Sequence, residues 1–192
     1  MKRLVGLVLC GGRSQRMGSD KGLLTALGSK PWAVRQVGLL ANYNIDVWIS
    51  LREEQYADYK NILPNTVFVP DTVPVGGPLG GLLSAHQMVR DKDFLVLACD
   101  MVSIDRKLLE RLIIEYQFSR KAEVYLYEHD ERLEPLCAIY TAAAMRKILS
   151  MHQDRQLPTF SLQRILEHLD CQRVALQFDA RFRNYNFPTD LL

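Results

Sequence analysis

A glycine pair followed by cationic side chains is the segment of this chain best suited to chemistry. An apolar run of residues 4–9 leads into Gly11 and Gly12. Glycines let a backbone approach a ligand closely, and cationic side chains donate charge-assisted hydrogen bonds to phosphate oxygens. The segment therefore predicts a site for an anionic ligand, a nucleotide in particular. Its cationic residues are Arg13, Arg16 and Lys21.

Two common phosphate-binding motifs do not fit this loop. A P-loop places four residues between its glycines and a lysine directly after the second one, whereas Gly12 and Gly18 enclose five residues and Lys21 comes three after Gly18. The loop also lacks the dinucleotide-binding pattern G-x-G-x-x-G. It therefore indicates another class of phosphate site.

A carboxylate stands at the end of a second apolar run. Residues 94–98 read as a buried strand, and Asp100 follows them after one cysteine. Mg²⁺ takes oxygen ligands, usually one or two carboxylates together with substrate phosphates, so Asp100 is a candidate metal ligand. The alternative is a structural role at the start of the next helix, which Ser103 or Asp105 could cap equally well.

A further aspartate precedes a turn rich in glycine and proline. Asp71 follows the short apolar run 66–69, and residues 76–81 read Gly-Gly-Pro-Leu-Gly-Gly. Such a turn allows close backbone approach to a ligand before a helix begins, which favours a nucleotide contact for Asp71. The alternative is ordinary turn stabilisation by the aspartate side chain.

The elements that must hold these residues alternate along the chain. Apolar runs typical of strands lie between amphipathic segments typical of helices, and the first three strands give a β-α-β-α-β order. The expected strands are 4–9, 46–51, 66–69, 94–98, 123–127, 136–140 and 173–177. The expected helices are 32–43, 53–61, 81–90, 106–119, 142–152 and 161–168.

This order predicts an α/β fold of Rossmann-like winding, with a mostly parallel central sheet and helices on both faces. Ligands of such sheets bind beyond the carboxyl ends of the strands. The glycine loop after Leu9 and the segment 99–101 after Ala98 both lie there, so we expect them to meet in one crevice. The length of 192 residues suits a single domain, 1–192.

Composition narrows the class of partner. The net charge of +2 comes without any block of like charges, which argues against a nucleic-acid polymer. The four cysteines are far apart in sequence, so neither a zinc site nor a disulfide framework is indicated. The first apolar run is too short for a secretion signal, and we expect a cytoplasmic protein with reduced thiols and no membrane association.

The loop from Leu9 to Lys21 resembles the signature L-x-G-G-x-S-x-R-M-G-x-D-K of the nucleotidyltransferases, and among them the molybdenum cofactor guanylyltransferases. Cys10 stands where that family usually has alanine. The segment 71–81 resembles the family's D-x(5)-G-P-L-x-G, and the end of the chain resembles its N-x-N-T-P-x-D-L, with Phe187 in place of threonine. The resemblance covers the whole chain.

The resemblance implies transfer of GMP from GTP to the terminal phosphate of molybdopterin cofactor, which yields molybdopterin guanine dinucleotide and pyrophosphate. It assigns catalytic roles to Arg16, Lys21 and Asp100, with Mg²⁺ held by Asp100. It places GTP against Leu9, Cys10, Gly11, Gly12, Lys21, Asp71 and Asp100. It also implies transient contact with molybdenum cofactor delivery or acceptor proteins.

Two parts of the resemblance are less complete. Asn184 and Asn186 are expected on the pterin side of the site, with a capped terminal turn as the alternative. The family often has asparagine after the second strand, whereas this chain has Ser50, which can replace one hydrogen bond but not a two-pronged one. Ser50 therefore predicts fewer hydrogen bonds to guanine than the family's asparagine would make.

Other functions stay open on the sequence. Cytidylyl and uridylyl transferases share this loop, as do guanylyltransferases that act on cobinamide phosphate. The pair Gly11-Gly12 favours guanine among them. A nucleotide-binding module without activity is the alternative outside enzymes, and retention of Arg16, Lys21 and Asp100 argues against it.

Overall fold

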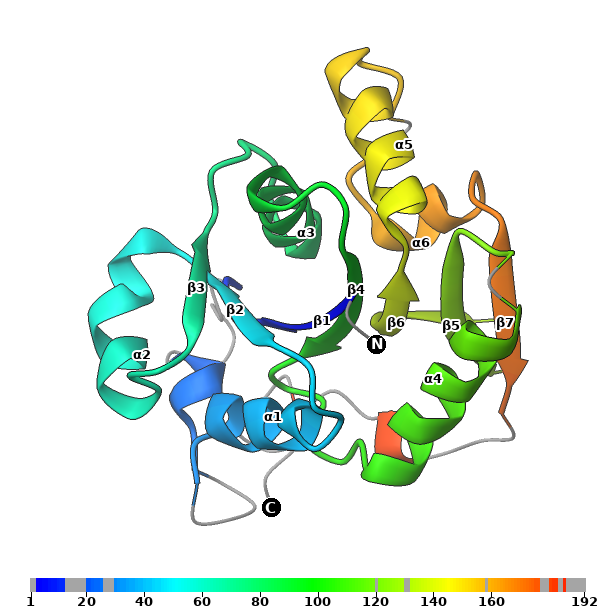
Figure 1. Ribbon diagram of the computed structural model, residues 1–192. Coiled ribbons are helices and arrows are strands. Elements are labelled where there is room, and N and C mark those ends of the chain that lie inside the picture. Colours follow the sequence, from blue (N-terminus) through cyan, green and yellow to red (C-terminus); the bar gives the residue numbers. More distant parts are fainter. Residues whose placement is uncertain are drawn as a thin grey trace.

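The strands that the structure describes form one seven-stranded sheet in the order β3-β2-β1-β4-β6-β5-β7 (Figure 1). The computed structural model describes residues 3–12, 20–25, 30–119, 121–129, 132–157, 159–176, 180–182 and 185. The strands are β1 (Leu4–Leu9), β2 (Val47–Leu51), β3 (Val67–Pro70), β4 (Asp93–Ala98), β5 (Val124–His129), β6 (Arg132–Tyr140) and β7 (Cys171–Ala175).

Most strand pairs are parallel, as the alternating order of elements predicts. β1 is parallel to both β2 and β4, β2 is parallel to β3, and β5 is parallel to β7. β6 is antiparallel to β4 and to β5, so it is the reversed strand of the sheet. The predicted Rossmann-like arrangement is confirmed, with one reversed strand.

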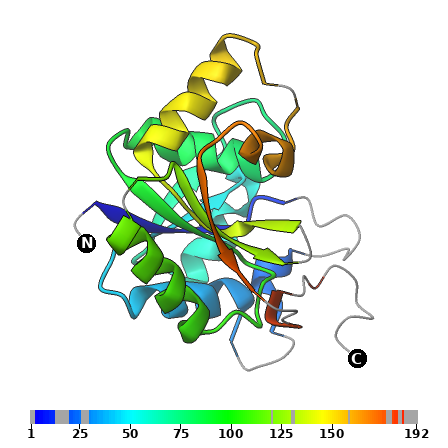
Figure 2. The same ribbon diagram turned by 90° about the vertical axis from the view of Figure 1, so that its right-hand side faces the viewer.

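Helices cover both faces of the sheet (Figures 1 and 2). One face carries α3 (Pro78–Met88), α5 (Ala142–Gln153) and α6 (Leu162–Leu166). The other carries α1 (Trp32–Ala41) and α4 (Arg106–Ser119), and Tyr59 of α2 (Tyr56–Ile62) packs into the same core. The two apolar clusters are separate, one on each side of the sheet.

β1 shows why its sequence is apolar throughout. All six of its residues are buried. Val5, Leu7 and Leu9 face the cluster under α3 and α5, whereas Leu4 and Val8 face the cluster under α1 and α4. A central parallel strand is buried on both faces, so it reads as a continuous apolar run rather than an alternating one.

Some element boundaries differ from the expected ones. α3 begins at Pro78 instead of residue 81, because Gly77 adopts a φ of 74° as its N-cap and proline is favoured in the first helical turn. The segment expected as one helix from residue 53 splits into a 3₁₀ turn, Glu53–Gln55, and α2. β7 begins and ends two residues early, where pairing with β5 sets its register.

Candidate active site

A cleft of about 170 Å³ opens at the carboxyl ends of β1, β2, β3 and β4. The crevice expected there is thus present, and the segments after β1 and β4 meet in it. The residues predicted to contact GTP all lie in its walls: Leu9, Cys10, Gly11, Gly12, Lys21, Asp71 and Asp100. The start of α3 and Ser50 complete much of the remaining surface.

Lys21 and Asp100 form an ion pair in this cleft. The Lys21 Nζ atom donates to Asp100 Oδ2 at 2.8 Å, and both side chains are about six-sevenths buried, with exposed fractions of 15% and 16%. The pair joins residues that are 79 positions apart in the chain. Asp105, and not Asp100, caps α4 by accepting a hydrogen bond from the Leu108 amide at 3.0 Å. Asp100 is therefore not used as a helix cap.

Asp71 reaches the glycine loop from the end of β3. A methyl group at Gly11 would come within 2.8 Å of Asp71 Oδ2, so a larger residue there would force the Asp71 carboxylate to move. The Ser50 hydroxyl donates to the other carboxylate oxygen at 3.3 Å. Asp71 keeps access to solvent, yet partial burial raises its pKa, while the Ser50 hydrogen bond and the charge of Arg52 oppose that rise.

The start of α3 forms one wall of the cleft and consists mostly of small residues. Gly77 and Pro78 line the cleft, and Gly81 lies against Ser50 of β2. An added methyl group at Gly81 would come within 2.1 Å of Ser50 Oγ. The glycine-rich sequence thus lets the backbone of α3 lie directly against the side chains of the sheet.

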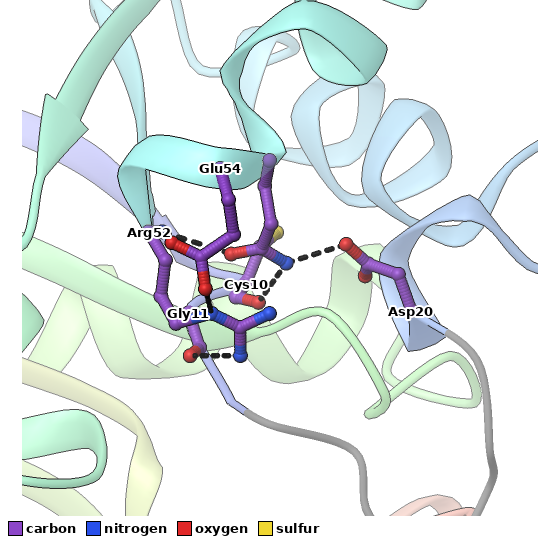
Figure 3. A network of polar contacts seen from close by, with 6 residues as sticks. Cys10, Gly11, Asp20, Arg52 and Glu54 are labelled. Carbon is purple, nitrogen blue, oxygen red and sulfur yellow. Dashed lines mark hydrogen bonds and ion pairs between the residues drawn. The ribbon is translucent and has the colours of Figure 1, made fainter.

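A network of hydrogen bonds from the β2–α2 connection holds the glycine loop (Figure 3). Arg52, at the end of β2, donates through Nη1 to the Gly11 carbonyl at 3.1 Å and through Nε to Glu54 at 2.7 Å. Gln55 donates to the Cys10 carbonyl at 3.2 Å and also to the Asp20 carboxylate. The backbone on both sides of segment 13–19 is therefore held by side chains from the β2–α2 connection.

Comparison with known proteins agrees with this geometry. Residues 6–174 match the family described as MobA-like NTP transferase domain. The chain belongs to this family. A probable molybdenum cofactor guanylyltransferase from Methanothermobacter thermautotrophicus is 32% identical over 96% of this chain and 95% of its own length.

Two further relatives extend the comparison. A molybdenum cofactor biosynthesis bifunctional protein from Synechocystis is 31% identical over 97% of this chain, which spans only 52% of that protein. The crystal structure of molybdopterin-guanine dinucleotide biosynthesis protein A from Archaeoglobus fulgidus has a TM-score of 0.76 at 22% identity, and the match covers 97% of this chain and 94% of that one. The shared nucleotidyltransferase fold is thus established.

The family's metal ion can be tested against the donors in the cleft. Among the described residues, no group of three or more His, Cys, Asp or Glu side chains forms a metal cluster. Mg²⁺ often takes a single protein carboxylate and completes its shell with water and substrate phosphates. Asp100 is a carboxylate of the cleft that could hold a cation arriving with a nucleotide, and this role stays a prediction from the sequence.

The cysteines of the cleft are packed rather than exposed. Cys10 and Cys99 are free thiols with exposed fractions of 3% and 6%. A hydrogen bond with Cys10 and burial raise the pKa of Cys99 well above its usual value, which disfavours the reactive thiolate. The cysteine at the alanine position of the signature is thus accommodated as part of the core.

Several predicted site residues lie outside the described part of the chain. These are Arg13, Arg16, Asn184 and Asn186. Their roles stay predictions from the sequence. Among the helices that are described, none is long and apolar enough to cross a membrane.

The sequence did not point to the supporting residues Arg52, Gln55 and Tyr59. Their contacts connect the β2–α2 region with the glycine loop, 39 to 45 positions away. Asp20 could have drawn attention, because it stands beside Lys21 in the signature. No local pattern marks Gln55 as a partner of Cys10 and Asp20.

Proposed function

We propose that this chain transfers GMP from GTP to the terminal phosphate of molybdopterin cofactor, forming molybdopterin guanine dinucleotide and releasing pyrophosphate. The observation that carries the proposal is the Lys21–Asp100 pair, 2.8 Å apart, in a cleft that it shares with Gly11 and Gly12. The relatives named as guanylyltransferases support the same assignment.

In this reaction a terminal phosphate oxygen of the pterin attacks the α-phosphorus of GTP. A new P–O bond forms there while the bond to the β-phosphate oxygen breaks, and pyrophosphate leaves with its electron pair. The attacking oxygen is already anionic, so no general base is needed.

The side chains of the cleft would act by placement and charge. Mg²⁺, when bound at Asp100, supplies charge neutralisation on the phosphates. Lys21 would leave its contact with Asp100 for the phosphates and neutralise the departing pyrophosphate, with Arg16 as a second cation. Alignment of two reactants contributes about 7–11 kcal/mol in favourable cases, so a rigid site is the main requirement.

Gly11, Gly12 and Asp71 would hold the nucleotide. The glycines leave space for it in the cleft, and the Asp71 carboxylate would accept a hydrogen bond from it. A cytoplasmic location and transient contact with molybdenum cofactor delivery or acceptor proteins belong to the same proposal, and we expect no nucleic-acid polymer and no membrane as partner.

Nucleotide choice is the sharpest test of this proposal. The purified chain would be supplied with MgCl₂, molybdopterin cofactor and each of GTP, ATP, CTP and UTP in turn, and pyrophosphate release would be measured. We expect release with GTP and not with CTP, because a site that hydrogen-bonds one base edge leaves buried polar groups unpaired with another.

The outcomes separate the remaining functions. Turnover with CTP or UTP at the rate seen with GTP would refute the guanylyl assignment and leave a nucleotidyltransferase of other specificity, which the small Ser50 makes a real alternative. Binding of GTP by calorimetry without any turnover would indicate an inactive nucleotide-binding module. The Asp100→Asn variant controls for contaminating activity.

A further inference from the structure

Gln55 makes an unusual set of contacts for a side chain outside the cleft. It is 4% exposed and lies at the end of the 3₁₀ turn Glu53–Gln55. Its amide nitrogen donates both to the Cys10 carbonyl, at 3.2 Å, and to the Asp20 carboxylate. Its amide oxygen accepts the Arg52 backbone N–H at 2.8 Å, which fixes the orientation of the amide.

These two acceptors stand at opposite ends of one segment. Cys10 is the first residue after β1, and Asp20 directly precedes Lys21. Both accept a hydrogen bond from the Gln55 amide, and dashed lines mark these contacts at Cys10 and Asp20 in Figure 3. The residues between them are those that the family signature assigns to the phosphates. One buried side chain thus joins the entry and the exit of the candidate phosphate-binding segment.

Asp20 also fixes the turn that carries Lys21. The second oxygen of Asp20 accepts the Tyr59 hydroxyl at 2.8 Å and the Gly22 backbone N–H at 3.0 Å, so Asp20 caps the 3₁₀ turn Lys21–Leu23. Burial raises the pKa of Tyr59, which keeps its phenol protonated as a donor. Lys21 therefore starts from a fixed turn when it reaches Asp100.

The donors of Gln55 satisfy the Cys10 carbonyl and the Asp20 carboxylate, so they also contribute to stability. A structural role and a positioning role therefore differ in their kinetic consequence rather than in the contacts themselves. A role in placing Lys21 has a large one, because misplacement by about 1 Å can cost a hundred-fold in rate.

We infer that Gln55 is a positioning residue for guanylyl transfer: it clamps Cys10 to Asp20 and thereby holds Lys21 at the reacting phosphates. The inference rests on the proposed function for its kinetic consequence. The clamp itself is a property of the unliganded protein and can be measured without turnover.

The test substitution is Gln55→Glu. It keeps the size of the side chain and an acceptor for the Arg52 N–H, but it turns the donor into a carboxylate oxygen that faces the Cys10 carbonyl and Asp20. Where both carboxylates are ionised they repel each other and the clamp opens, whereas a proton shared between them at lower pH would keep it closed, so each readout is taken at neutral and at alkaline pH. The matched control is Gln117→Glu, the same change at an exposed position of α4.

The first readout is amide hydrogen exchange in unliganded protein, on peptides that span residues 9–24. We expect faster exchange in Gln55→Glu than in the parent and no change in Gln117→Glu. Unchanged exchange in Gln55→Glu would overturn the clamp. This result does not depend on whether the chain uses GTP.

The second readout is a double-mutant cycle on kcat/KM for GTP. We expect Gln55→Glu to lower kcat/KM about ten- to a hundred-fold, the range for loss of a hydrogen bond to a charged group. In a Lys21→Ala background the same change should cost less than about three-fold, because there is no ammonium left to place. Full additivity would overturn the positioning role and leave a structural one.

Two further variants keep the test decisive. Gln55→Glu with Asp20→Asn restores a donor–acceptor pair between the two positions, and we expect it to recover part of the lost kcat/KM. If Gln55→Glu fails to fold, Tyr59→Phe is the replacement, because it removes only the hydroxyl that donates to Asp20. Its effect on kcat/KM should also be non-additive with that of Lys21→Ala, and smaller than the effect of Gln55→Glu. A parent without turnover would refute the proposed function, while the exchange data would still decide the clamp.

Discussion

Replacing Gly81 by alanine should push α3 away from the sheet. The added methyl group would lie 2.1 Å from Ser50 Oγ, 3.1 Å from Ser50 Cβ and 3.3 Å from Leu9 Cδ2. Rotation of the Ser50 hydroxyl can relieve the first contact, but it breaks the hydrogen bond to Asp71 and leaves the contact with Ser50 Cβ. Either the helix or β2 must shift.

The expected size follows from two opposing effects. Forcing an extra methyl group into a packed core costs about 1–3 kcal/mol, and the severe overlap places this site at the upper end. Alanine in a helix is favoured over glycine by about 1 kcal/mol. The net loss is about 2 kcal/mol in the free energy of unfolding, which for a chain of this size lowers Tm by about 4–8 °C.

Gly38→Ala is the matched control for this variant. Gly38 lies in α1, is exposed, and has no atom within 4 Å of an added methyl group. The same change should therefore stabilise the protein by about 0.5–1 kcal/mol and raise Tm by about 1–4 °C. Thermal unfolding of both variants, followed by circular dichroism, gives opposite signs if the packing argument is right.

A third variant tests the cause. In a Ser50→Gly background the methyl group at Gly81 meets neither the hydroxyl nor the Cβ atom, so Gly81→Ala should be neutral or stabilising there. A Gly81→Ala variant as stable as the parent, or one that stays equally destabilised without the Ser50 side chain, would show that close packing against β2 is not the reason for this glycine.

Three further predictions concern charge. Asp100→Asn should fold normally yet transfer GMP at less than about a tenth of the parent rate at saturating Mg²⁺, because an amide does not neutralise the cation; steady-state kinetics beside thermal unfolding decide this. Lys21→Ala should lower both the affinity for GTP and the turnover number, and together these losses should reduce kcat/KM by about ten- to a hundred-fold in steady-state kinetics. His86 is buried, with no hydrogen-bond partner for either ring nitrogen within the described structure, and burial with Arg146 and Arg90 lowers its pKa. Below about pH 6.5 the unfolded chain therefore binds a proton at His86 more readily than the folded chain does, so the free energy of unfolding falls as the pH drops through that value. His86→Leu should reduce this fall. Denaturant titrations of parent and variant at pH 7.5 and 5.5 measure it.

The sequence alone determined the class of fold and the edge of the sheet at which the site lies. The continuous apolar run of β1 marks a strand buried on both faces, and the alternation of strands and helices predicts a parallel sheet. From these two features it follows that the segments after Leu9 and Ala98 share one edge. The signature from Leu9 to Lys21 then indicates phosphate chemistry at that edge.

The tertiary structure decided how the site is held. The pairing of Lys21 with Asp100 spans 79 positions, and the contacts of Gln55 with Cys10 and Asp20 span 45 and 35. The same applies to Gly11, where a larger residue would displace the Asp71 carboxylate that lies against it. Periodicity and turn residues act over a few positions, so they fix strands, helices and loops. Contacts across the sheet depend on strand order and register, which only the packed chain determines.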